Sequence, residues 1–205
     1  MLELLDLDCI RGERRLFQGI RAALAPGTLM RVHGANGAGK TSLLRMICGL
    51  SLPARGEVRW NGVPVTSLKE EYGRQLVYLG HAVALKEDLS ALENLASASA
   101  LAGLAFRPED AVAALAAAGL ASREHLPVRV LSQGQKRRAG LARLRLSGSV
   151  PLWVLDEPFS ALDADAIEWL RTVLAEHLRR SGILVLTSHQ PVDIGAGARH
   201  VDLHL

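Results

Sequence analysis

The sequence predicts an α/β fold built around a phosphate-binding loop, and three stretches support that prediction. An apolar run at residues 29–32 leads into the glycine-rich turn 34–41, after which apolar residues recur at helical spacing. A second apolar run at 151–155 ends in two adjacent acids, and a third apolar run occupies 183–187. Runs of this length indicate buried strands, so strand, loop and helix follow one another in the order that a phosphate-binding loop requires.

Length and composition indicate one compact domain that stays in the cytoplasm. The 205 residues suffice for one well-packed core, and 49% of them are hydrophobic. The longest apolar tract, 111–121, is mostly alanine and falls well short of the roughly 18 residues that a membrane-spanning helix needs. Residues 1–9 carry acids where a signal peptide has basic residues, so we expect no export signal.

The net charge and the cysteines suggest an ordinary surface and a reduced interior. The net charge of +3 comes mostly from arginines scattered along the chain, which favours a solvated surface over one that binds anionic lipid or nucleic acid. Cys9 and Cys48 are too far apart in sequence for a CxxC metal or redox site, so we expect both to be buried as small apolar residues.

The glycine-rich turn has the composition of an anion cradle, because Gly34 to Thr41 satisfies G-x-x-x-x-G-K-[ST]. Its glycines allow successive N–H groups and the start of the next helix to point at phosphate oxygens. We expect Lys40 to reach the β- and γ-phosphates, Thr41 to hold Mg²⁺ and Ser42 to contact a second phosphate oxygen. The residues predicted to surround the phosphates are Gly34, Ala35, Asn36, Gly37, Ala38, Gly39, Lys40, Thr41 and Ser42. The apolar positions predicted for the following helix are Leu43, Leu44, Ile47 and Leu50.

The two acids after the strand at 151–155 supply the second half of a nucleotide-hydrolysing site. Asp156 can present its carboxylate to a Mg²⁺-bound water, and Glu157 can orient and deprotonate the water that attacks the γ-phosphate. The alternative is that Glu157 only caps the turn at Pro158. Together with the phosphate loop, the acids predict a nucleoside triphosphatase that uses Mg²⁺.

A further loop, Leu131-Ser132-Gln133-Gly134-Gln135, precedes a helix rich in basic residues. With Ser132 as its N-cap and small neighbours, such a helix start is a good anion receptor. The basic residues of that helix are expected to form a solvated face, and they are Lys136, Arg137, Arg138, Arg143 and Arg145.

This loop resembles the signature Leu-Ser-Gly-Gly-Gln of the ABC ATPases, with Gln133 in place of one glycine. In that family the signature loop contacts the γ-phosphate of ATP held by a partner subunit. The resemblance therefore implies that Ser132, Gln133, Gly134 and Gln135 act in trans, in a head-to-tail homodimer that encloses two ATP molecules.

The resemblance to ABC ATPases also implies roles for two residues in the last third of the chain. The stretch "SALD" matches the loop that couples the two ATP sites, with Asp163 as its acid. His189 follows the apolar run 183–187 and stands where the family has a histidine that contacts the γ-phosphate.

The same resemblance implies the architecture of the whole chain as a single ABC ATPase domain over residues 1–205. A RecA-like core of about 1–84 and 146–205 would carry an inserted helical lobe of about 85–145. The alternating pattern at 54–66 would be a strand hairpin of the family's antiparallel β subdomain.

The chain departs from the common ABC pattern at two positions. His81 stands where the family usually has a glutamine that senses Mg²⁺ and contacts the membrane subunit. Imidazole can ligate a metal or bond a metal-bound water, so we expect His81 either to sense Mg²⁺ or to act as a contact residue without a catalytic part. Near the N-terminus a tyrosine often stacks on adenine, but this chain has Ile10, Arg11 and Gly12, which leaves Arg11 or an apolar lid as alternatives, and Phe17 is expected in the core.

Four stretches resemble one ABC subfamily more closely, the CcmA family of ATP-binding subunits for bacterial cytochrome c maturation (haem exporter ATPases). They are "CIRGERRLF", "GANGAGKTSLLR", "YLGH" followed by "LSALENL", and "LSQGQKRR". The resemblance implies a translocase ATPase that is peripheral to the cytoplasmic face of the bacterial inner membrane. Its expected partners are a CcmB-type membrane subunit with CcmC, CcmD and the haem chaperone CcmE, and ATP hydrolysis would drive haem export or release of the haem-loaded chaperone.

Three other functions compete with this interpretation. The first is an ABC transporter subunit with a different cargo, and only the resemblance to the subfamily, not the chemistry of the residues, favours cytochrome c maturation over it. A soluble ABC-type ATPase acting on DNA or ribosomes would need a coiled-coil insertion or two fused ATPase units, which 205 residues do not accommodate, so we expect no nucleic-acid partner. A binding module with an inactive site is disfavoured by the presence of Lys40, Thr41, Asp156, Glu157 and His189.

Overall fold

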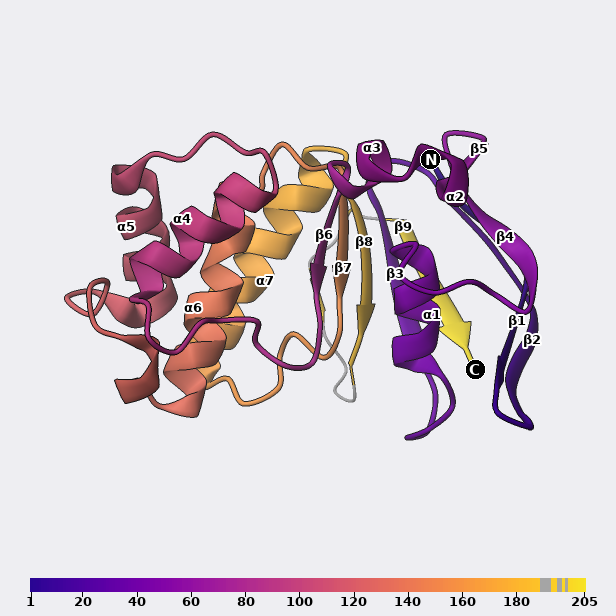
Figure 1. Ribbon diagram of the computed structural model, residues 1–205, viewed down its shortest axis with the longest axis horizontal. Coiled ribbons are helices and arrows are strands. Elements are labelled where there is room, and N and C mark those ends of the chain that lie inside the picture. Colours follow the sequence, from indigo (N-terminus) through magenta and orange to yellow (C-terminus); the bar gives the residue numbers. More distant parts are fainter. Residues whose placement is uncertain (189–192, 195–196, 198) are drawn as a thin grey trace.

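The computed structural model describes residues 1–188, 193–194, 197 and 199–205, and it contains two β-sheets with helices between and beside them (Figure 1). The first elements are β1 (Leu2–Arg11), β2 (Arg14–Leu24), β3 (Thr28–His33), α1 (Lys40–Ile47), β4 (Arg55–Trp60) and β5 (Val63–Pro64). Next come α2 (Val65–Leu68), α3 (Glu70–Gly73), β6 (Leu76–Leu79), α4 (Ala91–Leu101) and α5 (Pro108–Leu115). A π-helical turn (Ala116–Leu120) and a 3-10 turn (Val128–Val130) precede α6 (Gln133–Leu146), β7 (Leu152–Leu155), α7 (Ala164–Arg179), β8 (Ile183–Thr187) and β9 (Arg199–His204).

The two sheets differ in strand direction. The larger sheet is parallel with the spatial order β6-β7-β8-β3-β9, and the smaller is antiparallel with the order β2-β1-β4-β5. The predicted α/β fold with an antiparallel β subdomain is thereby confirmed, and β9 lies at an edge of the parallel sheet. The predicted hairpin at 54–66 is right for β4 and β5, but α2 begins at Val65.

Helix α1 lies between the two sheets and covers one face of the parallel sheet, while α6 and α7 cover the other (Figure 1). Along β7, Leu152 and Val154 join the core around α1, whereas Trp153 and Leu155 join the core under α6 and α7. Successive side chains of a strand point to opposite faces, so a strand covered on both sides is apolar throughout. The continuous apolar runs in the sequence follow from this burial.

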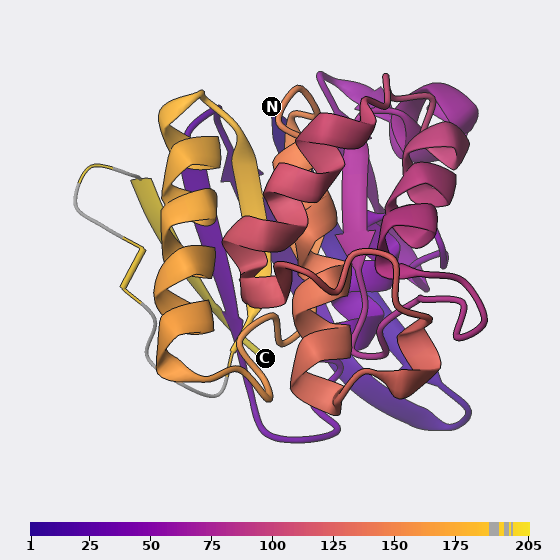
Figure 2. The same cartoon turned by 90° about the vertical axis from the view of Figure 1, so that its left-hand side faces the viewer.

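The opposite face of the parallel sheet is covered by helices. Figure 2 views the molecule from this side, with the helices of residues 91–179 in front of the sheet. Helices α4, α5 and α6 share a cluster of alanine and leucine side chains with the π-helical turn, while Leu141 and Leu144 of α6 pack with the sheet. The division of the chain into a core and a helical lobe of about 85–145 stays a prediction.

None of the helices among the described residues combines the length and the apolar character that a bilayer crossing needs.

Helix α1 is shorter than the apolar spacing predicts. It ends at Ile47, and the chain turns at Gly49, whose φ of 70° lies in the left-handed region. The N–H of Leu50 donates to the carbonyl of Arg45 at 2.8 Å, and the Leu50 side chain is 55% exposed. Leu43, Leu44 and Ile47 are buried as expected, but the prediction for Leu50 is wrong because the glycine ends the helix first.

The expected solvated face of α6 is also wrong in part. Arg137 is only 7% exposed, because its side chain turns into the protein rather than toward water. By contrast, the predictions for Cys9, Cys48 and Phe17 are confirmed, since all three are buried. Burial raises the pKa of the Cys48 thiol to about 12, which keeps it in the unreactive neutral form.

We expect His177 of α7 to make the stability of the protein sensitive to acid. Its ring stacks on Trp153 with ring centroids 3.8 Å apart. Burial lowers the pKa of His177 from 6.5 to about 4, so the folded state favours the neutral ring. The unfolded chain binds the proton more tightly, and stability present above pH 6.5 is lost as the pH falls toward 4, by about 3 kcal/mol.

We therefore expect His177→Phe, which keeps a ring against Trp153, to lose less stability than the wild type over this pH range. The free energy of unfolding by urea, measured for both proteins above pH 6.5 and near pH 4, checks this expectation. Equal losses in the two proteins would show that His177 does not govern the acid sensitivity.

Candidate functional site

The phosphate loop joins the end of β3 to the start of α1. Gly39 is the N-cap of α1 with a φ of 107°, and a Cβ there would lie 3.0–3.1 Å from side-chain atoms of Leu16 and Phe17 on β2. Only glycine combines that backbone conformation with so close a neighbour. The antiparallel sheet therefore packs against the loop where α1 begins, and this contact fixes the direction in which the first N–H groups of the helix point.

Lys40 folds back over the loop that precedes it. Its Nζ donates to the carbonyl of Gly34 at 2.8 Å and to that of Ala35 at 3.4 Å. The ammonium group thus lies above the anion cradle formed by the loop and by the N-terminus of α1. The loop combines a positive charge with the N-terminus of a helix, which is the arrangement that binds phosphate groups.

Asp156 is the buried centre of the site, with 3% of the residue exposed. It follows β7 directly, and its N–H donates to the carbonyl of Leu79 at 2.8 Å. One carboxylate oxygen accepts a hydrogen bond of 2.8 Å from the Thr41 hydroxyl, and the other accepts one of 2.7 Å from the Thr187 hydroxyl. These bonds join α1, β7 and β8 at the carboxyl ends of the strands, where parallel sheets bind their ligands.

Sequence reasoning missed Thr187. Its Oγ1 accepts a hydrogen bond of 2.9 Å from the N–H of Glu157 while it donates to Asp156, so one hydroxyl positions both acids. The signal in the sequence was the one hydroxyl residue within the otherwise apolar strand β8, at its end. The structure shows that this residue is fully buried. A buried hydroxyl needs partners, and an adjacent strand ending in two acids could supply them.

Glu157 begins the turn after β7 with a φ of 50°, in the left-handed region that residues other than glycine seldom adopt. Its carbonyl accepts a hydrogen bond from the N–H of Ser160 at 3.1 Å, so the turn is closed by the backbone. Strained conformations of this kind persist where surrounding contacts hold them, and they cluster at functional sites. The assignment of Glu157 as the catalytic base stays a prediction.

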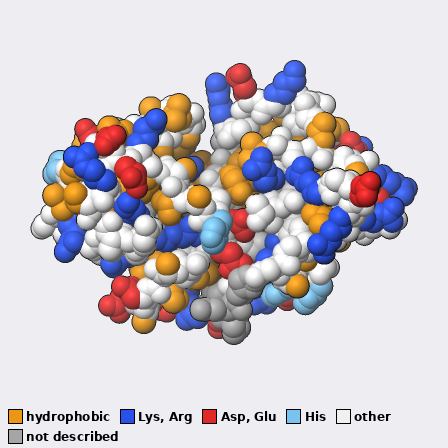
Figure 3. Space-filling model, turned by 60° about the horizontal axis from the view of Figure 1, so that its bottom comes forward, with side chains coloured by type: hydrophobic (Ala, Val, Ile, Leu, Met, Phe, Trp, Pro, Cys, Tyr) orange, Lys and Arg blue, Asp and Glu red, His pale blue; other side chains and the backbone are white. Residues whose placement is uncertain are grey.

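A cleft of about 470 Å³ connects these elements, and Figure 3 shows the face on which it opens. It has the size of a site for a nucleotide-sized ligand. The predicted site residues that line it are Ala35, Asn36, Gly37, Gly39, Lys40, Thr41, Ser42, His81, Asp156 and Glu157. Leu16 of β2 also lines the cleft. If adenine does not stack on Arg11, an apolar side chain would have to cover it, and Leu16 is such a side chain in the cleft.

The Mg²⁺ expected with ATP has oxygen ligands available in this cleft. The Thr41 hydroxyl and the Asp156 carboxylate are 2.8 Å apart, and Mg²⁺ prefers such oxygen donors while keeping several waters. Among the residues that the structure describes, no three or more His, Cys, Asp and Glu side chains form a metal-binding group. One hydroxyl beside one carboxylate suits a Mg²⁺ ion that takes its other ligands from water and from the phosphates of the nucleotide.

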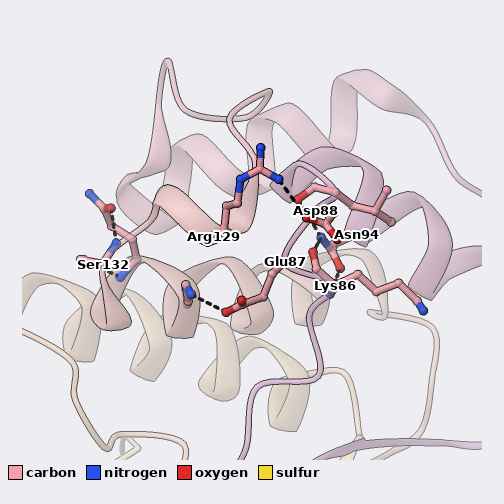
Figure 4. Close-up of polar contacts among 9 residues, drawn as sticks. Lys86, Glu87, Asp88, Asn94, Arg129 and Ser132 are labelled. Carbon is pink, nitrogen blue, oxygen red and sulfur yellow. Dashed lines mark hydrogen bonds and ion pairs between the residues drawn. The ribbon is translucent and has the colours of Figure 1, made fainter.

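The signature-like loop lies apart from that cleft, at the start of α6. Ser132 is the N-cap, as predicted: its Oγ accepts from the N–H of Gln135 at 3.3 Å, and its own N–H donates to the Gln135 side chain at 2.9 Å (Figure 4). Gln133 lines a neighbouring cavity of about 410 Å³, which shares His81 with the nucleotide cleft. Ser132, Gly134 and Gln135 line neither cavity.

The segment between β6 and α4 is bound by polar contacts to α6, to the 3-10 turn that precedes α6, and to α4. Lys136 of α6 pairs with Glu87 at 2.7 Å, and Arg129 pairs with Asp88 at 2.8 Å (Figure 4). The Asn94 side chain accepts from the N–H of Lys86 at 2.7 Å and donates to its carbonyl at 3.0 Å. These contacts fix the path of the chain that carries His81 away from the sheet.

The remaining predicted residues have different places. Asp163 is the N-cap of α7, where its carboxylate accepts from the N–H of Ala166 at 3.0 Å and lies 3.7 Å from Arg138. His81 is exposed at the border of the two cavities. Gly34 and Ala38 belong to the phosphate loop without lining the cleft. His189 lies outside the described residues.

Comparison with known proteins gives consistent matches. Residues 17–160 match the family model described as ABC transporter. The cytochrome c biogenesis ATP-binding export protein CcmA of Dechloromonas aromatica is 51% identical over 197 residues, which cover 96% of each chain. The protein of the same name from Pseudomonas aeruginosa is 52% identical over 190 residues, which cover 93% of each chain.

Solved structures match the fold. An ABC transporter ATP-binding protein from Pyrococcus furiosus superposes with a TM-score of 0.83 at 27% identity, covering 98% of this chain and 96% of its own. A dimeric ATP-binding cassette, solved in a post-hydrolysis state with ADP and phosphate, superposes with a TM-score of 0.79 at 24% identity, covering 93% of this chain and 88% of its own. The second likeness shows the fold alone.

The hydroxyl of Thr187 provides a direct test of the site. Thr187→Val keeps the shape of the side chain but leaves one buried oxygen of Asp156 and the N–H of Glu157 without their partner. We expect ATP hydrolysis to fall by about tenfold or more, since small displacements of reacting groups are costly, and unfolding to become easier by about 1–3 kcal/mol.

Thr187→Ser, which restores the hydroxyl, is the matched control and should retain most of the turnover. Steady-state ATP hydrolysis and thermal unfolding of the three proteins check this prediction. Equal turnover by the valine and serine variants would contradict it.

Proposed function

The chain belongs to the CcmA family of ABC transporter ATP-binding proteins, and we propose on that basis that it is the ATP-hydrolysing subunit of a membrane complex for cytochrome c maturation. Hydrolysis of ATP to ADP and phosphate would be coupled to haem export or to release of the haem-loaded chaperone. The observation that carries the enzymatic part is the cleft itself, in which the phosphate loop faces Asp156 and Glu157.

The geometry suggests how each group would act on ATP. The phosphate loop and Lys40 would bind the β- and γ-phosphates, and Thr41 with Asp156, which Thr187 also holds, would bind Mg²⁺ directly or through its waters. Bound Mg²⁺ would neutralise charge on the phosphates. The Glu157 carboxylate accepts a proton from the attacking water, so hydroxide character develops in line with the leaving ADP. His81 is placed to sense the metal or to contact a partner at the edge of the same cleft.

Dimerisation completes the proposed site. Ser132 caps a helix whose start lies outside the chain's own nucleotide cleft, so its N-terminal donors can serve a nucleotide bound to a second copy. A head-to-tail homodimer would then enclose two ATP molecules, with Asp163 and His189 contributing as they do in the family. The fold of this chain matches a cassette solved as a dimer.

The proposed location and partners follow from the family. The chain would bind peripherally to the cytoplasmic face of the bacterial inner membrane, on a CcmB-type subunit, together with CcmC, CcmD and the haem chaperone CcmE. A transporter ATPase for a different cargo remains the second candidate, since the nucleotide cleft is the same in both cases.

Replacing the proposed base separates ATP binding from hydrolysis. Glu157→Gln preserves size but cannot accept the proton, so we expect turnover to fall by roughly 10²-fold or more while an ATP-bound closed dimer accumulates. Lys40→Ala should instead prevent productive nucleotide binding, because it removes the cation above the loop. Phosphate release and size-exclusion chromatography with and without ATP measure the two effects.

Glu168→Gln offers a matched control for this change, because Glu168 lies exposed on α7 and pairs with Arg171. It should hydrolyse ATP at the wild-type rate. Normal turnover by Glu157→Gln would rule out Glu157 as the base.

The cargo is tested in cells whose only copy of the gene carries Glu157→Gln. We expect covalent c-type haem, detected by haem staining of membrane proteins, to disappear while the chaperone accumulates in its haem-loaded form. The Glu168→Gln strain should stain like wild type. Unchanged cytochromes in a strain without another maturation route would overturn the cytochrome c assignment and favour a different cargo.

A further inference from the structure

Arg137 of α6 is a buried cation that the proposed chemistry does not use. Only 7% of the residue is exposed, although it lies in the basic stretch that follows the signature-like loop. Arg145, two turns further along the same helix, is 45% exposed at its side chain and pairs with Glu176 at 3.0 Å. The two arginines therefore share a helix and a residue type but differ in surroundings.

The guanidinium of Arg137 donates hydrogen bonds to backbone carbonyls from two separate segments. Nη1 donates to His81 at 3.0 Å and to Gly80 at 3.4 Å, which follow β6. Nη2 donates to Glu157 at 2.6 Å and to Asp156 at 3.2 Å, which follow β7. The planar fork of arginine can span two such carbonyl pairs, whereas the compact ammonium of lysine cannot.

The charge of Arg137 is unnecessary for packing alone. Burial lowers the pKa of its guanidinium, while the carboxylates of Asp156 and Glu157 raise it. Burying a cation carries a desolvation cost, and an apolar side chain of similar volume would often stabilise a fold as well. What the guanidinium adds is the bond between the two strand ends.

The segment after β6 also packs closely on α6. A Cβ on Gly140 would lie only 2.5 Å from Cγ1 of Val83, so the absence of a side chain at this position lets the segment touch the helix. Gly140 lies one turn beyond Arg137 on α6. Helix α6 therefore contacts the segment after β6 at two places. Gly140 packs against Val83, and Arg137 donates to the carbonyls of Gly80 and His81, so we expect the helix and the segment to move together.

We propose that Arg137 is a positioning residue for ATP hydrolysis: by holding the backbones that carry His81 and Glu157, it makes the placement of both side chains in the cleft depend on the orientation of α6. This inference rests on the proposed ATPase function. The phosphate loop receives no hydrogen bond from Arg137. Nucleotide binding and hydrolysis should therefore respond differently to the loss of the guanidinium.

The first test uses the purified membrane complex with Arg137→Met, Arg137→Lys and the matched control Arg145→Met. We expect kcat to fall about tenfold or more in the methionine variant, because displaced reacting groups slow the chemistry, with the KM for ATP within about twofold of wild type because the phosphate loop is untouched. The lysine variant should recover part of kcat, and Arg145→Met should match wild type.

The second test uses hydrogen exchange of the isolated chain and does not depend on catalysis. Arg137→Met should speed exchange at residues 80–85 and 156–160, where the carbonyls lose their donor, and should leave the antiparallel sheet unchanged. Arg145→Met should leave both segments unchanged. Thermal unfolding of each variant establishes that it is folded.

The outcomes separate this inference from the proposed function. An unchanged kcat, a loss confined to KM, or unchanged exchange in the two segments would overturn the role of Arg137. A wild-type complex that hydrolyses no ATP would instead overturn the proposed function, and the exchange measurement would still decide whether Arg137 holds the two strand ends.

Discussion

The site depends on one buried carboxylate, that of Asp156. A buried charge is tolerated only when its oxygens find partners, and here the hydroxyls of Thr41 and Thr187 satisfy one oxygen each. Since Thr41 belongs to α1 and Thr187 ends β8, the carboxylate draws the phosphate-binding helix and two neighbouring strands to a common point. The position of the phosphate loop relative to Glu157 follows from this requirement, because the N–H of Glu157 bonds to the same Thr187 hydroxyl.

The packing on either side of the parallel sheet supports that arrangement. Helix α1 is enclosed between the two sheets, so its buried face is large relative to its length and its N-terminus cannot shift without disturbing the core. On the opposite face, α6 and α7 share a second core with the sheet. The cleft therefore lies between elements that are each fixed by their own apolar contacts.

The parts of the site predictable from sequence are those built by neighbours along the chain. The phosphate loop and the acids after β7 are local patterns whose chemistry follows from residue type and spacing. Thr187 and Arg137 were missed because their partners are distant in sequence: Thr187 meets Asp156 across 31 positions, and Arg137 meets His81 across 56. A basic stretch on a helix is ordinarily solvated, and only the tertiary structure shows that one arginine turns inward. The prediction for Leu50 was wrong for a local reason: it followed the apolar spacing past Gly49, although that glycine ends α1.

Nucleotide binding and hydrolysis thus have different structural origins in this chain. The cradle for the phosphates is a continuous unit of β3, loop and α1, held by β2 at Gly39 and by β8 and β9 on either side of β3. Glu157, by contrast, is held in a left-handed conformation by a hydroxyl from β8 and a guanidinium from α6, whose hydrogen bonds go to the segments after β6 and β7 rather than to the phosphate loop. If Glu157 activates the attacking water, as proposed, a reorientation of α6 would displace this residue while the phosphate loop stays in place. Under the proposed function, that separation is what allows a membrane partner acting on the helices to control when bound ATP is hydrolysed.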